Sequence, residues 1–370
     1  MERDPMNTGW YPGKVKKDVM KKDQFHSAQK LIESMVPSGG YPAFASAYEA
    51  DPGQRILGRG RLDEEIITCL RKSDAKVVAI KTVPSERSSF VELQRQFFVY
   101  GKLQEHLTAK DFVVPVLGVT VDREAEILHV ATEVLDHGHI MARVGAEKPW
   151  SEERIWHVMK GLFTALAKVH ALGLAHRQVR LDNLLAGSDG IDHPLLGGFT
   201  LACPAERRDD ESPDDVFIKR HADGIYLAPE LFKCFDNPSY LTSPKQDVFA
   251  AGVVLHVLLF GKSPYCAVDD DISTNWDRIM NSVCAKRDKV PTMFDRDMAG
   301  SLVTTTSPGS LDLLDRLLAS KPEKRPDSAA VLKLPYFRDP LKRPPKKDRQ
   351  VAHGSVRAFI DRRTNVGRYS

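Results

Sequence analysis

The sequence HRQVRLDN, residues 176–183, is the most informative segment of the chain. A long helical pattern precedes it: Ser151 suits a helix N-cap, and apolar residues recur at helical spacing from Ile155 to Val169. Gly173 then ends the helix. A short hairpin and the sequence LLGGFT, residues 195–200, follow. The spacing therefore predicts a helix, a polar loop and a hairpin, in that order.

The part of the chain before this helix has the pattern of strands. Apolar runs separated by charged turns predict a small, mostly antiparallel sheet, with one helix inserted at Phe90 to Leu103. The predicted strands are Ile66-Ile67, Val77 to Ile80, Phe112 to Val119 and Ile127 to Val134. Further helices are predicted at Asp247 to Phe260 and Leu311 to Ala319. Strands first and helices second predict an α+β chain in two lobes.

We divide the chain into four parts on this pattern. They are an N-terminal extension (residues 1–52), a β-rich N-lobe with one main helix (53–135), a larger helical C-lobe (136–338) and a basic tail (339–370). In the extension, Lys14 to Met35 predicts a basic amphipathic helix that either packs on its own domain or lies on an anionic membrane. The tail is either a solvated segment or a docking segment for an acidic partner or an anionic membrane.

Composition excludes several classes of protein. Lys and Arg total 53 against 50 Asp and Glu, a net charge of +3, which does not favour nucleic-acid binding. No apolar run approaches the roughly 18 residues of a membrane span, and Met1 to Trp10 has no signal-peptide core, although a trimmed chain would look the same. The five cysteines form no metal-binding cluster, so no metal site is expected. They are either buried free thiols or include one disulfide, for which Cys234 and Cys266 are the first choice.

Further short motifs occur in one order along the chain, and the order gives them specificity. They are VAIK at residues 78–81, the HRQVRLDN and LLGGFT segments, APE at 228–230, DVF at 247–249 and KRP at 324–326. On these motifs the chain resembles the eukaryotic protein-kinase family from about residue 53 to 338, which implies a bilobal α+β kinase fold.

The resemblance implies roles for two sets of residues. Lys81 would hold nucleotide phosphates, and Thr132 would border an adenine pocket next to the hinge residue Glu133. The positions implied for nucleotide binding are Gly58, Gly60, Ala79, Lys81, Thr132, Glu133 and Asn183. A second set would be structural, with Asp247 anchoring the catalytic loop and Glu230 paired with Arg325. These structural positions are His176, Arg177, Glu230, Asp247 and Arg325.

The positions that the family uses for chemistry are altered. Gln178 replaces the catalytic-loop aspartate that accepts the substrate proton, and Gly198 replaces the aspartate that binds Mg²⁺. Gln96 falls where the glutamate partner of the strand lysine belongs, although Glu92 one turn earlier is an alternative partner. The glycine-rich segment keeps two glycines but places Asp63 at the third position; it is either an eroded phosphate loop or an ordinary turn.

We expect a pseudokinase: a catalytically inactive scaffold or allosteric binding module, with weak, absent or metal-independent nucleotide binding. No cofactor is expected, with the exception of ATP bound without Mg²⁺. The alternatives are unorthodox phosphoryl transfer that uses Asp182, Asn183 and Lys81, or a nucleotide sensor. Protein partners are expected at the C-lobe, at the terminal extensions or at the activation segment, which carries an acidic run at residues 209–215.

The basic N-terminal helix, the loop ending VRLDN and the altered metal position also resemble the secreted rhoptry-type kinases and pseudokinases of apicomplexan parasites. That resemblance implies a parasite organelle, vacuole or cyst as the location of the protein. Without it, the expected location is the cytoplasm.

Overall fold

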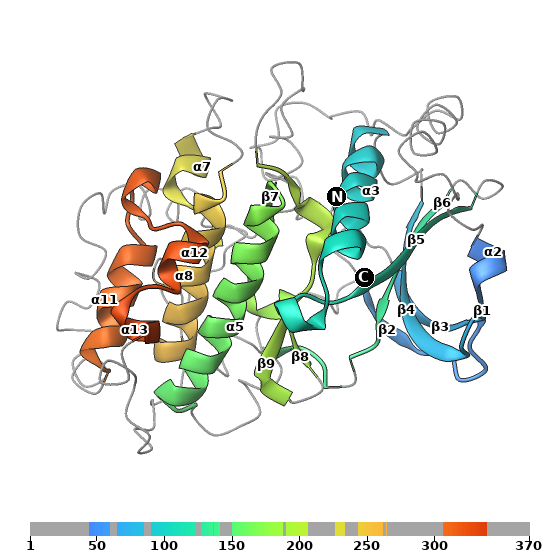
Figure 1. The fold of residues 1–370 in the computed structure, drawn as a ribbon, viewed down its shortest axis with the longest axis horizontal. Coiled ribbons are helices and arrows are strands. Elements are labelled where there is room, and N and C mark those ends of the chain that lie inside the picture. The colour runs from blue at the N-terminus through green and yellow to red at the C-terminus, as the bar shows by residue number, and fades with distance from the viewer. Residues whose placement is uncertain are drawn as a thin grey trace, which may run out of the picture. The chain divides into compact units, whose positions relative to one another are not determined.

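The computed structural model describes residues 44–59, 65–84, 90–122, 127–135, 137–140, 150–187, 190–205, 226–233, 243–261, 264 and 306–338. The chain divides into two compact units, one of Met1–Phe98 with Leu117–Thr132 and the other of Val99–Val116 with Glu133–Ser370. The first holds an antiparallel sheet and the second is mainly helical (Figure 1). The predicted α+β fold is therefore confirmed.

Six strands form the sheet of the N-terminal unit. They are β1 (Tyr48–Ala50), β2 (Ile56–Arg59), β3 (Glu65–Arg71), β4 (Lys76–Pro84), β5 (Val116–Asp122) and β6 (Ile127–Glu133). Their order is β1-β3-β4-β6-β5, and β2 also pairs with β3. β3 runs antiparallel to β1, β2 and β4. Buried β-branched side chains such as Val78 and Ile80 explain why β4 is a central strand.

Strand β1 pairs with β3 in this sheet and follows directly on the short helix α2 (Phe44–Ala47), although the sequence pattern assigns both to the extension. Tyr48 is buried in a cluster with Cys69, Val78 and Ile80, and Phe44 packs at its edge. A Cβ atom at Gly118 would lie 2.7 Å from the Tyr48 hydroxyl, so a side chain at residue 118 would require the Tyr48 side chain to shift. The end of the extension thus completes the core of the N-terminal unit.

One prediction about the strands is wrong. Residues 112–115 were assigned to a strand, but β5 starts at Val116. The 3-10 helix η2 (Ala109–Asp111) ends on Phe112, whose φ of 62° puts its backbone in the left-handed region. That conformation cannot continue a strand, and the apolar run gave no sign of it. The helix α3 (Phe90–His106) corresponds to the predicted inserted helix.

The central helix of the C-terminal unit is α5 (Glu152–Ala171), as the apolar stripe predicted. Ser151 caps it by accepting a hydrogen bond from the Arg154 N–H at 3.3 Å. The buried Glu152 carboxylate accepts hydrogen bonds from the backbone and hydroxyl of Ser307 and from the Ser310 hydroxyl, at 2.6–2.8 Å. These bonds tie α5 to the start of α11 (Pro308–Leu317).

Helix α8 (Lys245–Phe260) packs against both α5 and α11, and nearly all of its residues are buried. Among the described residues of the C-terminal unit, further helical elements are α7 (Pro229–Lys233), η8 (Pro322–Lys324), α12 (Ser328–Val331) and α13 (Pro335–Arg338). No helix among the described residues has the length and apolar character needed to cross a membrane.

In the described part of the C-terminal unit, two small sheets flank the segments of residues 176–183 and 197–202. β7 (Leu174–Ala175) pairs with β10 (Cys203–Pro204), and the hairpin of β8 (Leu184–Gly187) and β9 (Gly190–Leu196) is the predicted one. Between them lie the 3-10 helices η3 (Leu181–Asn183) and η4 (Phe199–Leu201). Cys69 and Cys203 are buried free thiols.

Several predictions concern residues outside the described ranges. They are the helix at Lys14 to Met35, the glycine segment from Gly60 to Asp63, the acidic run at 209–215, the pair Cys234 and Cys266, and the tail from residue 339.

Candidate functional site

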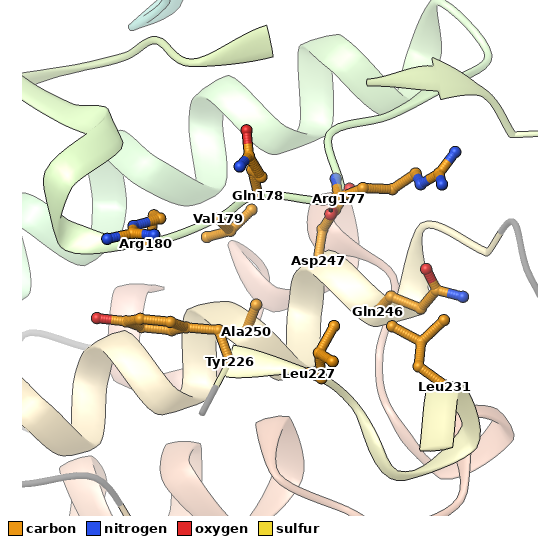
Figure 2. A pocket seen from close by; sticks show the side chains of 10 residues that line it. All are labelled: Arg177, Gln178, Val179, Arg180, Tyr226, Leu227, Leu231, Gln246, Asp247 and Ala250. Carbon is orange, nitrogen blue, oxygen red and sulfur yellow. Dashed lines mark hydrogen bonds between the residues drawn. The ribbon is translucent and has the colours of Figure 1, made fainter. Parts of the chain in front are cut away.

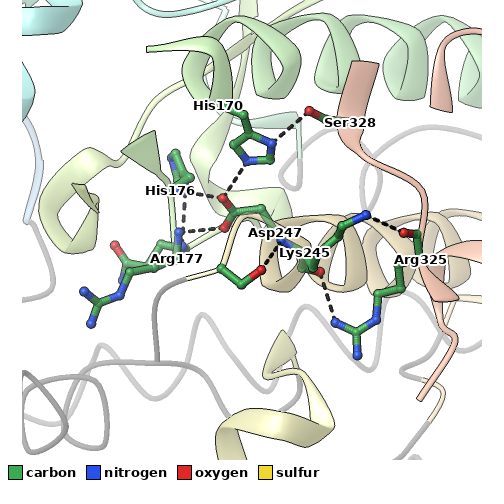
Figure 3. A network of polar contacts seen from close by, with 9 residues as sticks. His170, His176, Arg177, Lys245, Asp247, Arg325 and Ser328 are labelled. Carbon is green, nitrogen blue, oxygen red and sulfur yellow. Dashed lines mark hydrogen bonds and ion pairs between the residues drawn. The ribbon is translucent and has the colours of Figure 1, made fainter. Parts of the chain in front are cut away.

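The loop of residues 176–183 is anchored on Asp247, in the first turn of α8 (Figure 3). One carboxylate oxygen accepts the backbone N–H of His176 and the other accepts that of Arg177, both at 2.7 Å. His170 of α5 contacts the same carboxylate through Nε2 at 2.9 Å and the Ser328 hydroxyl through Nδ1 at 2.8 Å. Burial of Asp247 favours a higher pKa, but the hydrogen bond and charge of His170 and the other contacts outweigh it, so its pKa is lowered.

Arg177 shows why this anchor is needed. Its φ of 63° is in the left-handed region, which is unfavourable for a residue with a side chain. Such a conformation persists only when its surroundings hold it, and the bond from its N–H to Asp247 is one of the contacts that do so. Asp247 therefore fixes the backbone at the point from which Gln178 projects.

His176 holds the loop from within, because it is fully buried and bonded at both ring nitrogens. Nδ1 accepts the N–H of Gln178 at 3.1 Å, so the proton must be on Nε2, which donates to the Gly197 carbonyl at 2.9 Å. The ring also packs edge-on against Phe199, with centroids 4.5 Å apart. Burial lowers the pKa of His176, opposed in part by the nearby Asp247.

Gln178 is the residue that the resemblance aligns with the family's catalytic base. It is one of the residues that line a pocket between the loop and the start of α8, and its side chain points away from Tyr226 and Leu227 (Figure 2). The other lining residues in the loop and beside α8 include Arg177, Val179, Arg180 and Leu231. The Gln178 side chain is largely buried. The position thus offers a neutral amide that can donate and accept hydrogen bonds but cannot take up a proton near neutral pH.

Asp182 carries the one carboxylate within residues 176–183, and it forms an ion pair with Arg180. Nε of Arg180 donates to Asp182 Oδ2 at 2.6 Å, and a second guanidinium nitrogen contacts the same oxygen. The Asp182 carboxylate is thus held by a charged partner two residues away in the same loop. The sequence interpretation had not identified Arg180 as this partner.

Gly198 and Asn183 lie against each other. Gly198 has a φ of +75°, and a Cβ placed there would come within 2.3 Å of the Asn183 side chain. The Asn183 amide is fixed by a hydrogen bond from Nδ2 to the carbonyl of Gln178 at 2.8 Å. The space next to Gly198 is therefore filled by the Asn183 side chain.

Lys81 on β4 contacts Gln96 on α3 in the N-terminal unit. Nζ of Lys81 donates to Oε1 of Gln96 at 3.1 Å, and both side chains are buried. The structure thus brings together the lysine and the glutamine that the sequence had aligned with the family's ion pair. The alternative partner, Glu92, has a side chain outside the described part of the chain.

Of the other positions that the resemblance implies for nucleotide binding, Asn183 lies in η3 and Gly60 lies outside the described ranges, and the remaining four lie in the six-stranded sheet. Ala79 is buried on β4, Gly58 is in β2, and Thr132 and Glu133 end β6, half-buried and exposed respectively.

Glu230 and Arg325 form the buried ion pair that the resemblance implied. Two guanidinium nitrogens of Arg325 donate to the two carboxylate oxygens of Glu230, each at 2.7 Å. Arg325 also donates to the carbonyls of Ala319 and Lys245, and it lies 4.8 Å from the ring centroid of Phe249. This arrangement satisfies a fully buried guanidinium and ties α7 to the segment before α12.

Sequence reasoning missed His170, which joins α5, α8 and α12 through Asp247 and Ser328. A weak signal existed, because His170 follows Leu166 by four residues and so puts a polar side chain on the buried stripe of α5. Its partner Asp247 is 77 residues away in sequence, which the stripe cannot reveal.

Comparison with known proteins identifies the family. The protein kinase domain family matches residues 53–337. Calcium-dependent protein kinase 25 of Arabidopsis thaliana is 24% identical over 284 residues, covering 76% of this chain and 49% of the relative. Calcium-dependent protein kinase 2 of Oryza sativa subsp. japonica is 25% identical over 284 residues, with coverages of 76% and 50%. Calcium-dependent protein kinase 24 of the same species is 26% identical over 300 residues, with coverages of 76% and 54%.

The fold, the anchored loop and the Glu230–Arg325 pair are those of a protein-kinase domain. The chain belongs to the protein kinase family. It spans about half the length of the curated relatives it matches.

The family uses Mg²⁺, and the residues of this chain do not fit that ion. Mg²⁺ sites need oxygen ligands in octahedral geometry and usually include at least one carboxylate. The resemblance places Gly198 at the position of the metal-binding carboxylate, and Asp182, which is next to Asn183 in sequence, is paired with Arg180. The described residues hold no group of three or more His, Cys, Asp or Glu side chains suited to a metal ion.

Proposed function

We propose that this chain is a pseudokinase, a protein-kinase fold that acts by binding other proteins and does not transfer phosphate. The observation that carries the proposal is Gln178 at the position of the catalytic base. An amide cannot accept the proton of a substrate hydroxyl near neutral pH, and a positioned base contributes about 10²–10⁴-fold to the rate.

A second change supports the same proposal. With Gly198 in place of a carboxylate, Mg²⁺ lacks its anionic ligand, and Asp182 is held by Arg180. Phosphoryl transfer depends on positioning and on neutralising phosphate charge, which the metal supplies in the family.

Nucleotide binding by this chain is weak, absent or independent of metal. Lys81 retains a phosphate-binding ammonium, and its contact with the neutral Gln96 leaves the pair with one net positive charge. A family Lys–Glu pair is neutral. This difference supports nucleotide binding that does not depend on Mg²⁺, with Lys81 as the phosphate contact.

A thermal-shift measurement with ATP, with and without Mg²⁺ or Mn²⁺, separates the possibilities, because a ligand that binds the native state raises its stability. No shift supports the proposed scaffold, whereas a shift that does not depend on metal would favour the nucleotide sensor. A shift that requires the metal would contradict the proposal. Lys81→Met is the control, since it should abolish any specific shift.

The names of the relatives favour a second candidate, an active protein kinase. In this chain such an activity would need Asp182, Asn183 and Lys81 to replace the missing groups. The Arg180–Asp182 pair counts against it, because Asp182 would have to leave a charged partner to act as a base. A phosphorylation assay of Asp182→Asn beside the wild-type chain tests this candidate directly.

We also propose that the chain is of the secreted rhoptry type, in an organelle, vacuole or cyst of a parasite, and that its partners are proteins. The support is the loop ending VRLDN together with Gly198 and the basic N-terminal segment. Vesicle co-sedimentation of the chain with and without residues 1–40 tests the accompanying idea of peripheral membrane contact. Equal sedimentation of the two forms would exclude that role for the N-terminal segment.

A further inference from the structure

The buried amide of Gln96, in the N-terminal unit, has a hydrogen-bond donor that the described residues do not satisfy. Gln96 lies on α3 and is 0% exposed, and Lys81 lies on β4 and is 8% exposed. An ammonium can only donate, so the Gln96 atom that Lys81 Nζ contacts at 3.1 Å is the oxygen Oε1. The nitrogen Nε2 is the other branch of the amide, and no atom of the described residues accepts a hydrogen bond from it.

The unsatisfied Nε2 indicates the kind of atom that would complete the site. A buried N–H without an acceptor is rare in native proteins, because nothing replaces the hydration that it has lost. The missing acceptor must also suit the charge of the pair. Lys81 and the neutral Gln96 together carry one positive charge, which a glutamate at residue 96 would cancel. An anionic oxygen meets both requirements, since it accepts hydrogen bonds and is attracted by an ammonium.

Phosphate is the anion that fits two donors on different side chains. It offers several anionic oxygens, and lysine is a common phosphate ligand. Mg²⁺ bound to a phosphate uses some of these oxygens as its own ligands and lowers the negative charge of the group. A site with one positive charge and an N–H donor therefore favours a phosphate that carries no metal.

We propose that Gln96 is a specificity-determining residue, which forms with Lys81 a site for a phosphate group without Mg²⁺. Lys81 supplies the charge, and Gln96 Nε2 supplies a second hydrogen bond to the phosphate. The phosphate belongs either to a nucleotide or to an inorganic polyphosphate, which share this chemistry. The inference deepens the metal-independent nucleotide binding proposed above and rests on it for the role of Lys81.

Calorimetric titration of the purified chain with ATP and with tripolyphosphate, each in EDTA and in excess Mg²⁺, tests the site. We expect binding in EDTA that weakens when Mg²⁺ is added. Equal affinities for the two ligands would identify the phosphate group alone as the ligand, and binding of ATP only would identify a nucleotide; both results support the site. Binding of neither ligand in EDTA, or tighter binding in Mg²⁺, would overturn it.

Two variants of Gln96 separate its two contributions. Gln96→Glu cancels the positive charge and replaces the N–H donor with an acceptor, so affinity in EDTA should fall by at least about tenfold. Gln96→Met is neutral and of similar length but lacks the amide, so affinity should fall by about 3–10-fold. The control is Lys72→Met, which removes an exposed lysine of the same unit and should bind like the wild-type chain.

Wild-type affinity in both Gln96 variants would overturn the proposal. Their melting temperatures show whether the variants are folded, and Gln96→Glu is expected to fold because it gives Lys81 a charged partner. Phosphoryl transfer is measured in parallel on the unmodified chain. Transfer together with an affinity that depends on Gln96 would refute the proposed function alone, and an affinity independent of Gln96 without transfer would refute the site alone.

Discussion

Gln96 and Gln178 are the two amides that the resemblance aligns with carboxylates of the kinase family, and their contacts differ. Gln96 still contacts Lys81, so the strand lysine keeps a hydrogen-bonding partner in the N-terminal unit. Gln178 keeps only the backbone role of its position, through its N–H to His176 and its carbonyl to Asn183. The hydrogen bonds that hold the loop therefore do not depend on the side chain that chemistry requires.

Restoring the two aspartates tests this separation of structure from chemistry. We predict that Gln178→Asp with Gly198→Asp gives no phosphoryl transfer and lowers the free energy of unfolding by at least about 2 kcal/mol. The backbone of residue 198 is left-handed, which disfavours a side chain, and the new side chain would displace that of Asn183. Urea unfolding and a phosphorylation assay measure the two effects, with Gln178→Asp alone as the control. A stable, active double variant would contradict the prediction.

His176 predicts the direction of a pH dependence. Its pKa in the folded chain lies below the ordinary value of 6.5, because burial disfavours the imidazolium. As the pH falls from about 7 to about 5 the unfolded chain takes up the proton first, so stability is full above about 6.5 and is lost below it. We expect a slope of up to about 1.4 kcal/mol per pH unit in urea unfolding, and a smaller one in His176→Asn. Equal slopes in the two chains would contradict this assignment.

At the scale of elements, the Glu230–Arg325 pair connects α7 to the turn before α12. Glu230→Ala would leave a guanidinium with a side-chain exposure of 0% without its carboxylate. We predict a loss of about 3–5 kcal/mol in the free energy of unfolding. The matched control is Asp312→Ala, which breaks an Arg316 pair whose members are about half exposed, and it should cost about 0.5 kcal/mol or less. Similar losses for the two variants would show that the buried pair does not anchor α7.

The sequence predicted elements where local signals agree. The N-cap Ser151, the apolar stripe and Gly173 define α5 because each is a local property of the helix. The predicted start of β5 was wrong because Phe112 adopts a left-handed conformation, which its bulky side chain disfavours on steric grounds and which the apolar run does not signal.

The motifs predicted candidate residues for the site, but most of the contacts between these residues could be identified only from the structure. Lys81 with Gln96 and Glu230 with Arg325 follow from their places in the family's order of motifs. The His170–Asp247–Ser328 contacts and the approach of Asn183 to Gly198 do not, because they depend on how backbones separated in sequence meet.

At the scale of the whole molecule, residues before the start of the kinase match contribute to stability. Tyr48 is 5% exposed and packs with residues of β3, β4 and β6. We predict that Tyr48→Ala lowers the free energy of unfolding by about 3–5 kcal/mol. Ile56→Ala is the control, since Ile56 is 66% exposed and its truncation should change little. If Tyr48→Ala were as mild as the control, the kinase domain would not need residues 44–50.

The contacts that stabilise the fold bear on the proposed binding function. Asp247 holds the loop of residues 176–183 and Arg325 holds α7, whereas the proposed function has Gln178 and Gly198 in place of the groups that would move a proton or hold Mg²⁺. A chain of this kind retains shape and surface, which are the properties that binding requires.

Incorporation of radiolabelled γ-phosphate by the purified chain tests this account most directly. The assay supplies ATP with Mg²⁺ or Mn²⁺ and a mixture of acceptor proteins, and Lys81→Met is measured beside the wild-type chain. The account predicts equal background incorporation for both, because neither has a catalytic base. Incorporation by the wild-type chain that is lost in Lys81→Met would contradict it.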